Sequence, residues 1–169
     1  MKKKIPGIFL FTFLALSTVA YSASYEETVA KWTSYEDVAN WMKKEFVYDY
    51  GRNVMSHGWN PRTPQETFRL KSGVCYDGAN FARDALNRVN PDYRARILFI
   101  RNSEGPPHHW VTSFKADGKL YIFDYAAGKR WTQIMGVHGP YNSLDDYAKF
   151  LSSLRMPKFT FQTVQETDK

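Results

Sequence analysis

The chain has 169 residues with 12 Phe, 11 Tyr and 5 Trp, which is ample apolar mass for one core and excludes a disordered chain. Its formal charge is +6 at pH 7, and after residues 2–4 the lysines and arginines are spread along the sequence without a block, so nucleic acid is not an expected partner. A single cysteine, Cys75, excludes a framework of disulfides within the chain.

The N-terminus has the layout of a secretory signal peptide. Three lysines at positions 2–4 precede an apolar stretch at residues 8–16, which is shorter than the ~20 residues of a membrane-spanning helix. Small residues then allow cleavage after Ala20 or after Ser22. We therefore expect a signal peptide at residues 1–22, a secreted or periplasmic protein, and no stable membrane insertion of the mature chain. Removal of residues 1–22 would lower the formal charge of the chain to about +3.

Capping patterns predict two helices early in the mature chain. Ser34 is followed three residues later by Asp37, so a helix should begin there and end near Gly51. Thr63 and Glu66 have the spacing of a capping box and should begin a second, shorter helix.

A third helix begins at or just before the cysteine. Apolar residues step along it by four, three, four and three positions, which places them on one face. These residues are Cys75, Ala79, Ala82, Leu86 and Val89. Asn90-Pro91 then ends the helix.

The second half of the chain changes to the period of strands. Asp117-Gly118 is a typical hairpin turn, and a capped helix follows at residues 143–154. The predicted strands are residues 95–100, 109–114, 120–125 and 158–164. Helices followed by antiparallel strands predict an α+β fold, with a helical layer on one sheet, in a single domain at residues 23–169.

Cys75 has more than one interpretation. A lone cysteine is often a small buried apolar residue, and a disulfide between two copies of the chain is a second interpretation. Its place in the first turn of a helix, two residues after Gly73, also suits a nucleophile. Unpaired N–H groups and the positive end of the helix dipole favour a thiolate there and could later hold an oxyanion.

A nucleophilic thiol needs a base, and the base needs an orienting partner. His108 and His109 lie at the start of one predicted strand, and Asp124 lies near the end of the next. With the turn at Asp117-Gly118, the residue numbers of two facing positions sum to about 235, so Asp124 faces Val111. Val111 and His109 point to the same face of their strand, which makes His109 and Asp124 diagonal neighbours on that face. A slip of one residue would select His108 instead.

Structural interpretations of these residues stay open. The two histidines follow two prolines and could form a solvated loop end. A metal site is disfavoured, because adjacent histidines on a strand point to opposite faces and no third ligand has the usual spacing. Asp124 could serve only a structural hydrogen bond. His57 and His138 are interpreted as isolated loop residues.

Three segments of the chain resemble the transglutaminase-like superfamily, which is related to papain-type cysteine proteases. The stretch TPQETFRLKSGVCYDGANFARDALN is similar to the Cys-bearing helix of that superfamily. HHWVTSF is similar to its His strand, and LYIFDY to its Asp strand. The resemblance extends from Glu36 to Ala126, which is over half of the chain.

The resemblance implies a papain-like core in which the Cys-bearing helix packs on an antiparallel sheet. It also implies that Cys75 is the nucleophile, His109 the general base and acid, and Asp124 the residue that orients the imidazole. Transglutaminases proper have His, any residue, Trp, Val, which selects His108 here. Bacterial protease-like relatives have His, an apolar residue, Val, which selects His109, and the hairpin register agrees with this choice.

These residues predict an enzyme that attacks an amide bond of a protein or peptide substrate and forms a thioester. Hydrolysis is favoured over transfer to an amine, because no segment indicates a site that excludes water. Gln65 or Trp59 could supply a second donor to the oxyanion. No cofactor and no metal is expected, and no acidic loop of the calcium-binding type is present. The alternative is a non-catalytic domain of the same fold, in which Trp59, Trp110 and Trp131 line a groove for a peptide or glycan.

Overall fold

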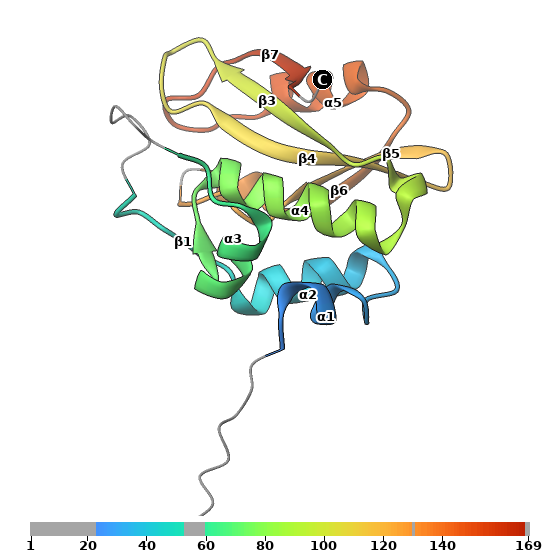
Figure 1. The fold of residues 1–169 in the computed structure, drawn as a ribbon. Coiled ribbons are helices and arrows are strands. Elements are labelled where there is room, and N and C mark those ends of the chain that lie inside the picture. Colours follow the sequence, from blue (N-terminus) through green and yellow to red (C-terminus); the bar gives the residue numbers. More distant parts are fainter. Residues whose placement is uncertain (1–22, 53–59, 130, 168–169) are drawn as a thin grey trace, which may run out of the picture.

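The computed structural model describes residues 23–52, 60–129 and 131–167. The predicted signal peptide, His57 and Trp59 lie outside these residues. In the described part most helices precede the main sheet, and one further helix lies in the chain between its last two strands, so the fold is α+β (Figure 1). No helix in this part is both long and apolar enough to cross a membrane.

The helices of the described residues are α1 (Tyr25–Val29), α2 (Tyr35–Glu45), α3 (Pro64–Leu70), α4 (Cys75–Val89) and α5 (Leu144–Ser153), with short 3-10 turns at Pro91–Tyr93 and Thr132–Ile134. The strands are β1 (Val47–Tyr48), β2 (Ser72–Gly73), β3 (Arg96–Asn102), β4 (His109–Ala116), β5 (Lys119–Asp124), β6 (Gly136–Tyr141) and β7 (Phe161–Glu166).

The predicted capping boxes begin the helices where the sequence indicated. Ser34 caps α2 with Asp37, and Thr63 caps α3 with Glu66. The predicted end of α2 near Gly51 is wrong, because the helix ends at Glu45. The next residues are β-branched and aromatic, and they form strand β1, which pairs in parallel with β2 directly before the cysteine.

The main sheet has the strand order β6-β5-β4-β3-β7, and neighbouring strands are antiparallel. The predicted hairpin register is confirmed, because Thr112 faces Phe123 and Ala116 faces Lys119. Strand β6 was not predicted, since its glycines and Pro140 have the composition of a turn; pairing with β5 makes it a strand nonetheless. His138 therefore lies in a strand rather than a loop, and its Nε2 donates to the carbonyl oxygen of Ile134 at 2.6 Å.

The two faces of the sheet are covered by different helices (Figure 1). Helix α4 lies between the sheet and helices α1 and α2, whereas α5 lies on the other side of the sheet. The first core contains, among others, Val38, Met42, Phe81, Leu86, Phe114 and Phe123. The second contains, among others, Leu98, Ile100, Val111, Ile122, Tyr147 and Leu151. Side chains of β4 alternate between the two faces of the sheet, so Phe114 belongs to the core under α4 and Val111 to the core under α5.

Helix α4 is fixed to the central strand β4 by a buried hydrogen bond as well as by packing. The hydroxyl of Thr112 donates to the carbonyl oxygen of Ala79 at 2.8 Å, and the Thr112 side chain is fully buried. This contact holds the first turns of α4 against the strand that begins at His109.

Candidate active site

Cys75 is the first residue of α4, and a buried carboxylate organises the backbone around it. Asp77 is fully buried; its Oδ2 accepts from the backbone N–H of Val74 at 3.0 Å, and its Oδ1 accepts from that of Arg62 at 2.8 Å. The Nε of Arg52 lies 3.2 Å from the same carboxylate. These contacts compensate for burying a charge and fix the backbone next to the cysteine. Cys75 keeps 9% of its surface exposed.

Two glycines allow close approaches at this end of α4. A Cβ on Gly73 would lie 2.6 Å from the Cβ of Asp77, so only glycine leaves room for the capping carboxylate. A Cβ on Gly78 would lie 2.3 Å from the Cβ of Ala126. Gly78 therefore lets the loop that follows Asp124 pack directly on the first turn of α4.

His109 and Asp124 form a buried pair beside this turn. The Nε2 of His109 lies 2.6 Å from Oδ2 of Asp124, and the two residues are 1% and 2% exposed. The other oxygen of Asp124 accepts from the backbone N–H of Ala126 at 3.2 Å. The indole of Trp131 stacks on the His109 ring, with centroids 4.6 Å apart and planes 11° apart. The ring is therefore held by a hydrogen bond at one nitrogen and by packing on its face.

The surroundings of His109 favour its charged form. Burial by itself lowers the pKa of His109, but the charge of Asp124 and its hydrogen bond outweigh burial and raise the pKa to about 10. The Cys75 side chain adds a smaller increase through a hydrogen bond and through its charge. Since Asp124 occupies Nε2, the remaining ring nitrogen for the sulfur is Nδ1.

The second histidine makes different contacts. The Nδ1 of His108 accepts from the backbone N–H of Asn102 at 3.2 Å, and its ring packs edge-on against Phe99 with centroids 5.3 Å apart. The structure thus brings His109, and not His108, into contact with Asp124.

Tyr48 is a residue at this site that the sequence did not single out. Burial raises the pKa of Tyr48, and the charge and hydrogen bond of the Cys75 side chain raise it further, while a hydrogen bond with the Cys75 backbone acts in the opposite direction. Its ring lies 3.3 Å from the position of a Cβ on Gly128, in the loop after Asp124. A phenol of raised pKa stays protonated at neutral pH and can donate a hydrogen bond beside the sulfur. In the sequence, the aromatic residues that follow α2 were the signal that could have indicated Tyr48.

The other predicted site residues lie elsewhere or outside the described part. The amide of Gln65 donates to Glu26 at 2.9 Å on the exposed surface of α3, so it does not serve the site. Trp110 packs on Tyr76, with ring centroids 5.8 Å apart, next to the cysteine along the chain. Within residues 23–52, 60–129 and 131–167, no group of three or more His, Cys, Asp or Glu side chains could hold a metal ion.

The chain is similar to known proteins at the level of a family and of a solved structure, whereas no curated protein matches it. Among solved structures, calcium-bound LapG of Legionella pneumophila is 22% identical, with a TM-score of 0.42. That match covers 52% of this chain and 50% of LapG, so it spans about half of each protein. A family model described as a transglutaminase-like domain matches residues 15–129, well over half of the sequence. The chain therefore belongs to the transglutaminase-like domain family.

Proposed function

We propose that the protein is a cysteine-dependent acyl-transfer enzyme in which Cys75, His109 and Asp124 act as a triad. The observation that carries the proposal is the buried His109–Asp124 pair, whose Nε2–Oδ2 distance is 2.6 Å and whose imidazole also interacts with Cys75. A nucleophile, a base and an orienting carboxylate in this relation are what covalent acyl transfer requires.

In this mechanism the imidazolium of His109 stabilises the thiolate of Cys75 in the resting enzyme. The sulfur attacks the carbonyl carbon of an amide, and the carbonyl electrons move to the oxygen. His109 then gives its proton to the departing amine, the C–N bond breaks, and a thioester remains on Cys75. Asp124 keeps the ring oriented and stabilises its charged form at each step.

A water molecule then resolves the thioester. Neutral His109 takes a proton from the water as it attacks the thioester carbon, and the carboxylic acid leaves as the sulfur regains its electrons. Hydrolysis is favoured over transfer to an amine, because an amine succeeds only where a site positions it and excludes water. A protein or peptide is the substrate class that supplies such an amide.

The oxyanion that forms on the carbonyl needs hydrogen-bond donors. The backbone N–H of Cys75 is one candidate, and the Tyr48 hydroxyl, which interacts with Cys75, is the second. Tyr48→Phe removes the hydroxyl and keeps the ring on Gly128, so it should lower kcat about 10- to 100-fold with KM nearly unchanged. A kcat within twofold of the wild type would rule out this role.

Export is part of the same proposal. Residues 1–22 would be removed by a signal peptidase, and the mature domain would act in the periplasm or outside the cell. Intact mass spectrometry of the protein from the periplasmic fraction should give a chain that begins at Tyr21 or Ala23. Recovery of the uncleaved chain alone would contradict export.

The function is tested by the reactivity of the thiol. Iodoacetamide should alkylate Cys75 near pH 6 much faster than a free thiol of pKa ~8.5, and His109→Ala should remove the advantage. A peptide library incubated with the mature protein should then give new carboxyl termini. New amide cross-links to an added amine would indicate a transglutaminase, and ordinary thiol reactivity without turnover would indicate a non-catalytic binding domain.

A further inference from the structure

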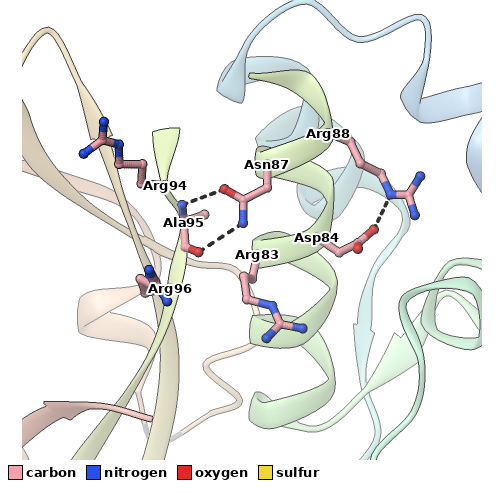
Figure 2. A pocket seen from close by; sticks show the side chains of 7 residues that line it. All are labelled: Arg83, Asp84, Asn87, Arg88, Arg94, Ala95 and Arg96. Atoms are coloured by element: carbon pink, nitrogen blue, oxygen red, sulfur yellow. Dashed lines mark hydrogen bonds and ion pairs between the residues drawn. The ribbon is translucent and has the colours of Figure 1, made fainter. Parts of the chain in front are cut away.

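A basic depression lies at the far end of α4 from the cysteine. It has a volume of about 550 Å³ and lies between the second half of α4 and the start of β3 (Figure 2). Four arginines line it, and they are Arg83, Arg88, Arg94 and Arg96. Arg83 and Arg88 come from the helix, whereas Arg94 precedes β3 and Arg96 is the first residue of that strand.

Among the described residues that line this depression, arginines outnumber carboxylates. Asp84 is the one carboxylate of that set. Its Oδ2 already accepts from the Nε of Arg88 at 2.6 Å and from the hydroxyl of Tyr25 at 2.6 Å. Among the residues that the structure describes, the ion pairs include neither Arg94 nor Arg96. Since guanidinium groups stay charged at every physiological pH, the depression attracts anions.

The base of the depression is fixed by two hydrogen bonds. The Asn87 side chain accepts from the backbone N–H of Ala95 at 2.7 Å and donates to its carbonyl oxygen at 3.1 Å (Figure 2). Arg94 and Arg96 are the neighbours of Ala95, so the same contact sets their backbone positions relative to α4. The backbone that carries these two arginines is thus fixed before a ligand binds, which lowers the ordering cost of binding.

A continuous face of α4 connects this depression to the candidate active site. Tyr76, Asn80, Arg83 and Asn87 step by four, three and four positions, and all four are half-buried. Tyr76 follows Cys75 directly, and Asn80 accepts from Arg83 at 2.8 Å. At about 1.5 Å per residue, Arg83 and Asn87 lie roughly 12–18 Å along the helix from the cysteine. An extended peptide at about 3.3 Å per residue spans this distance in roughly four to six residues.

We propose that the arginine-lined depression binds acidic side chains of a polypeptide substrate, roughly four to six residues from the bond that Cys75 attacks. The proposal rests on the proposed function and adds the substrate class. Arginine forks bind carboxylates through two parallel hydrogen bonds. The depression exceeds the size of one small anion, and its lining residue Arg83 lies on the same face of α4 as Tyr76, next to the nucleophile, which favours an extended chain with several carboxylates.

Peptide binding tests this proposal directly. A fluorescein-labelled hexaglutamate peptide and a matched hexaglutamine peptide are titrated onto the mature Cys75→Ala protein at 150 mM salt, and anisotropy is measured. The glutamate peptide should bind at least tenfold more tightly than the glutamine peptide. Arg94→Gln combined with Arg96→Gln should weaken glutamate binding about tenfold or more. Lys31→Gln combined with Lys43→Gln removes the same charge from exposed residues elsewhere and should change it less than twofold.

Three results would overturn the proposal. Equal affinity for the two peptides would show that acidic side chains are not recognised. An equal loss in the two double variants would show that net charge, and not the depression, attracts the peptide. Pyrophosphate bound through Arg94 and Arg96 without binding of the glutamate peptide would assign the depression to a small phosphate compound.

Thiol alkylation separates this proposal from the proposed function. The Arg94 and Arg96 double variant should keep the wild-type rate of Cys75 alkylation, since both arginines lie far along α4. Rapid alkylation without peptide binding would support the proposed enzyme and contradict the acidic subsite. Peptide binding together with an ordinary alkylation rate would support the acidic-peptide site and contradict the proposed enzyme.

Discussion

The two ends of helix α4 are built on different physical principles. At its N-terminal end, Asp77 and Asp124 are almost fully buried, and each carboxylate accepts two or more polar contacts. At its C-terminal end, Arg94 and Arg96 are exposed to solvent, and charge rather than burial gives that surface its character. Burial in a medium of low dielectric makes each polar contact strong and makes its loss costly.

This difference predicts how the two ends respond to substitution. A change at the buried end leaves a polar group without a partner, so it should affect both stability and the reactivity of Cys75. A change of an exposed arginine at the other end should alter binding of a charged ligand and leave the stability of the fold almost unchanged. Substitutions at five residues test the comparison.

The largest effect is expected for the two histidines compared with each other. His109→Ala should lower kcat about 10⁴-fold or more, because it removes the proton carrier next to the thiol. His108→Ala should change kcat less than about fivefold, since the ring contacts Asn102 and Phe99 instead. Steady-state kinetics on the two variants checks this, and similar losses in both would contradict the assignment of His109.

Asp124→Asn should have the next largest effect. It removes the charge that raises the pKa of His109 to about 10 and should lower kcat about 10³- to 10⁴-fold. The raised pKa means that the proton on His109 stabilises the fold fully below about pH 6.5 and that this contribution is lost as the pH rises through about 10. The alkaline limb of activity should therefore lie near pH 10 in the wild type and at lower pH in the variant.

A pH-rate profile and a urea titration on each protein separate catalysis from stability. The Asp124→Asn protein should unfold cooperatively, with its alkaline limb moved to lower pH. An unchanged limb would show that Asp124 does not set the charge of the imidazole, and a variant that is unfolded at pH 7 would identify Asp124 as structural.

The sequence predicted this buried pair because its signals are local. Asp117-Gly118 sets the hairpin register, and the register brings His109 and Asp124 to the same face. The start of α4 is likewise a local signal, because apolar residues recur every three or four positions from Cys75 to Val89. Such patterns depend on neighbours within a few residues, which a sequence displays directly.

The residues that were missed are brought together only by long-range packing. Tyr48 reaches Cys75 because β1 pairs in parallel with β2, and two-residue strands have no recognisable period. Strand β6 has a turn-like composition and becomes a strand only through pairing with β5. Arg83 and Arg96 line one depression only because Asn87 binds the start of β3.

Asp77→Ala should have a moderate effect that reaches both stability and the site. It leaves the N–H groups of Val74 and Arg62 and the charge of Arg52 without their buried partner, which should cost about 3 kcal/mol or more in the free energy of unfolding. The start of α4 should loosen, so alkylation of Cys75 should slow. If Asp77→Ala fails to fold, Asp77→Asn gives a second test. It keeps the shape of the side chain and one acceptor, so it should lower the free energy of unfolding by less. Stability within 0.5 kcal/mol of the wild type would contradict this role.

The smallest effect is expected for Asn87→Ala, the matched change at the other end of α4. It removes both hydrogen bonds to the backbone of Ala95 and should lower the free energy of unfolding by about 1–2 kcal/mol. Because Asn87 lies roughly 18 Å along the helix from Cys75, the alkylation rate should stay within twofold of the wild type. Binding of the hexaglutamate peptide should weaken, since Arg94 and Arg96 lose their fixed backbone positions. Slower alkylation with unchanged peptide binding would contradict the expected difference between the two ends of the helix.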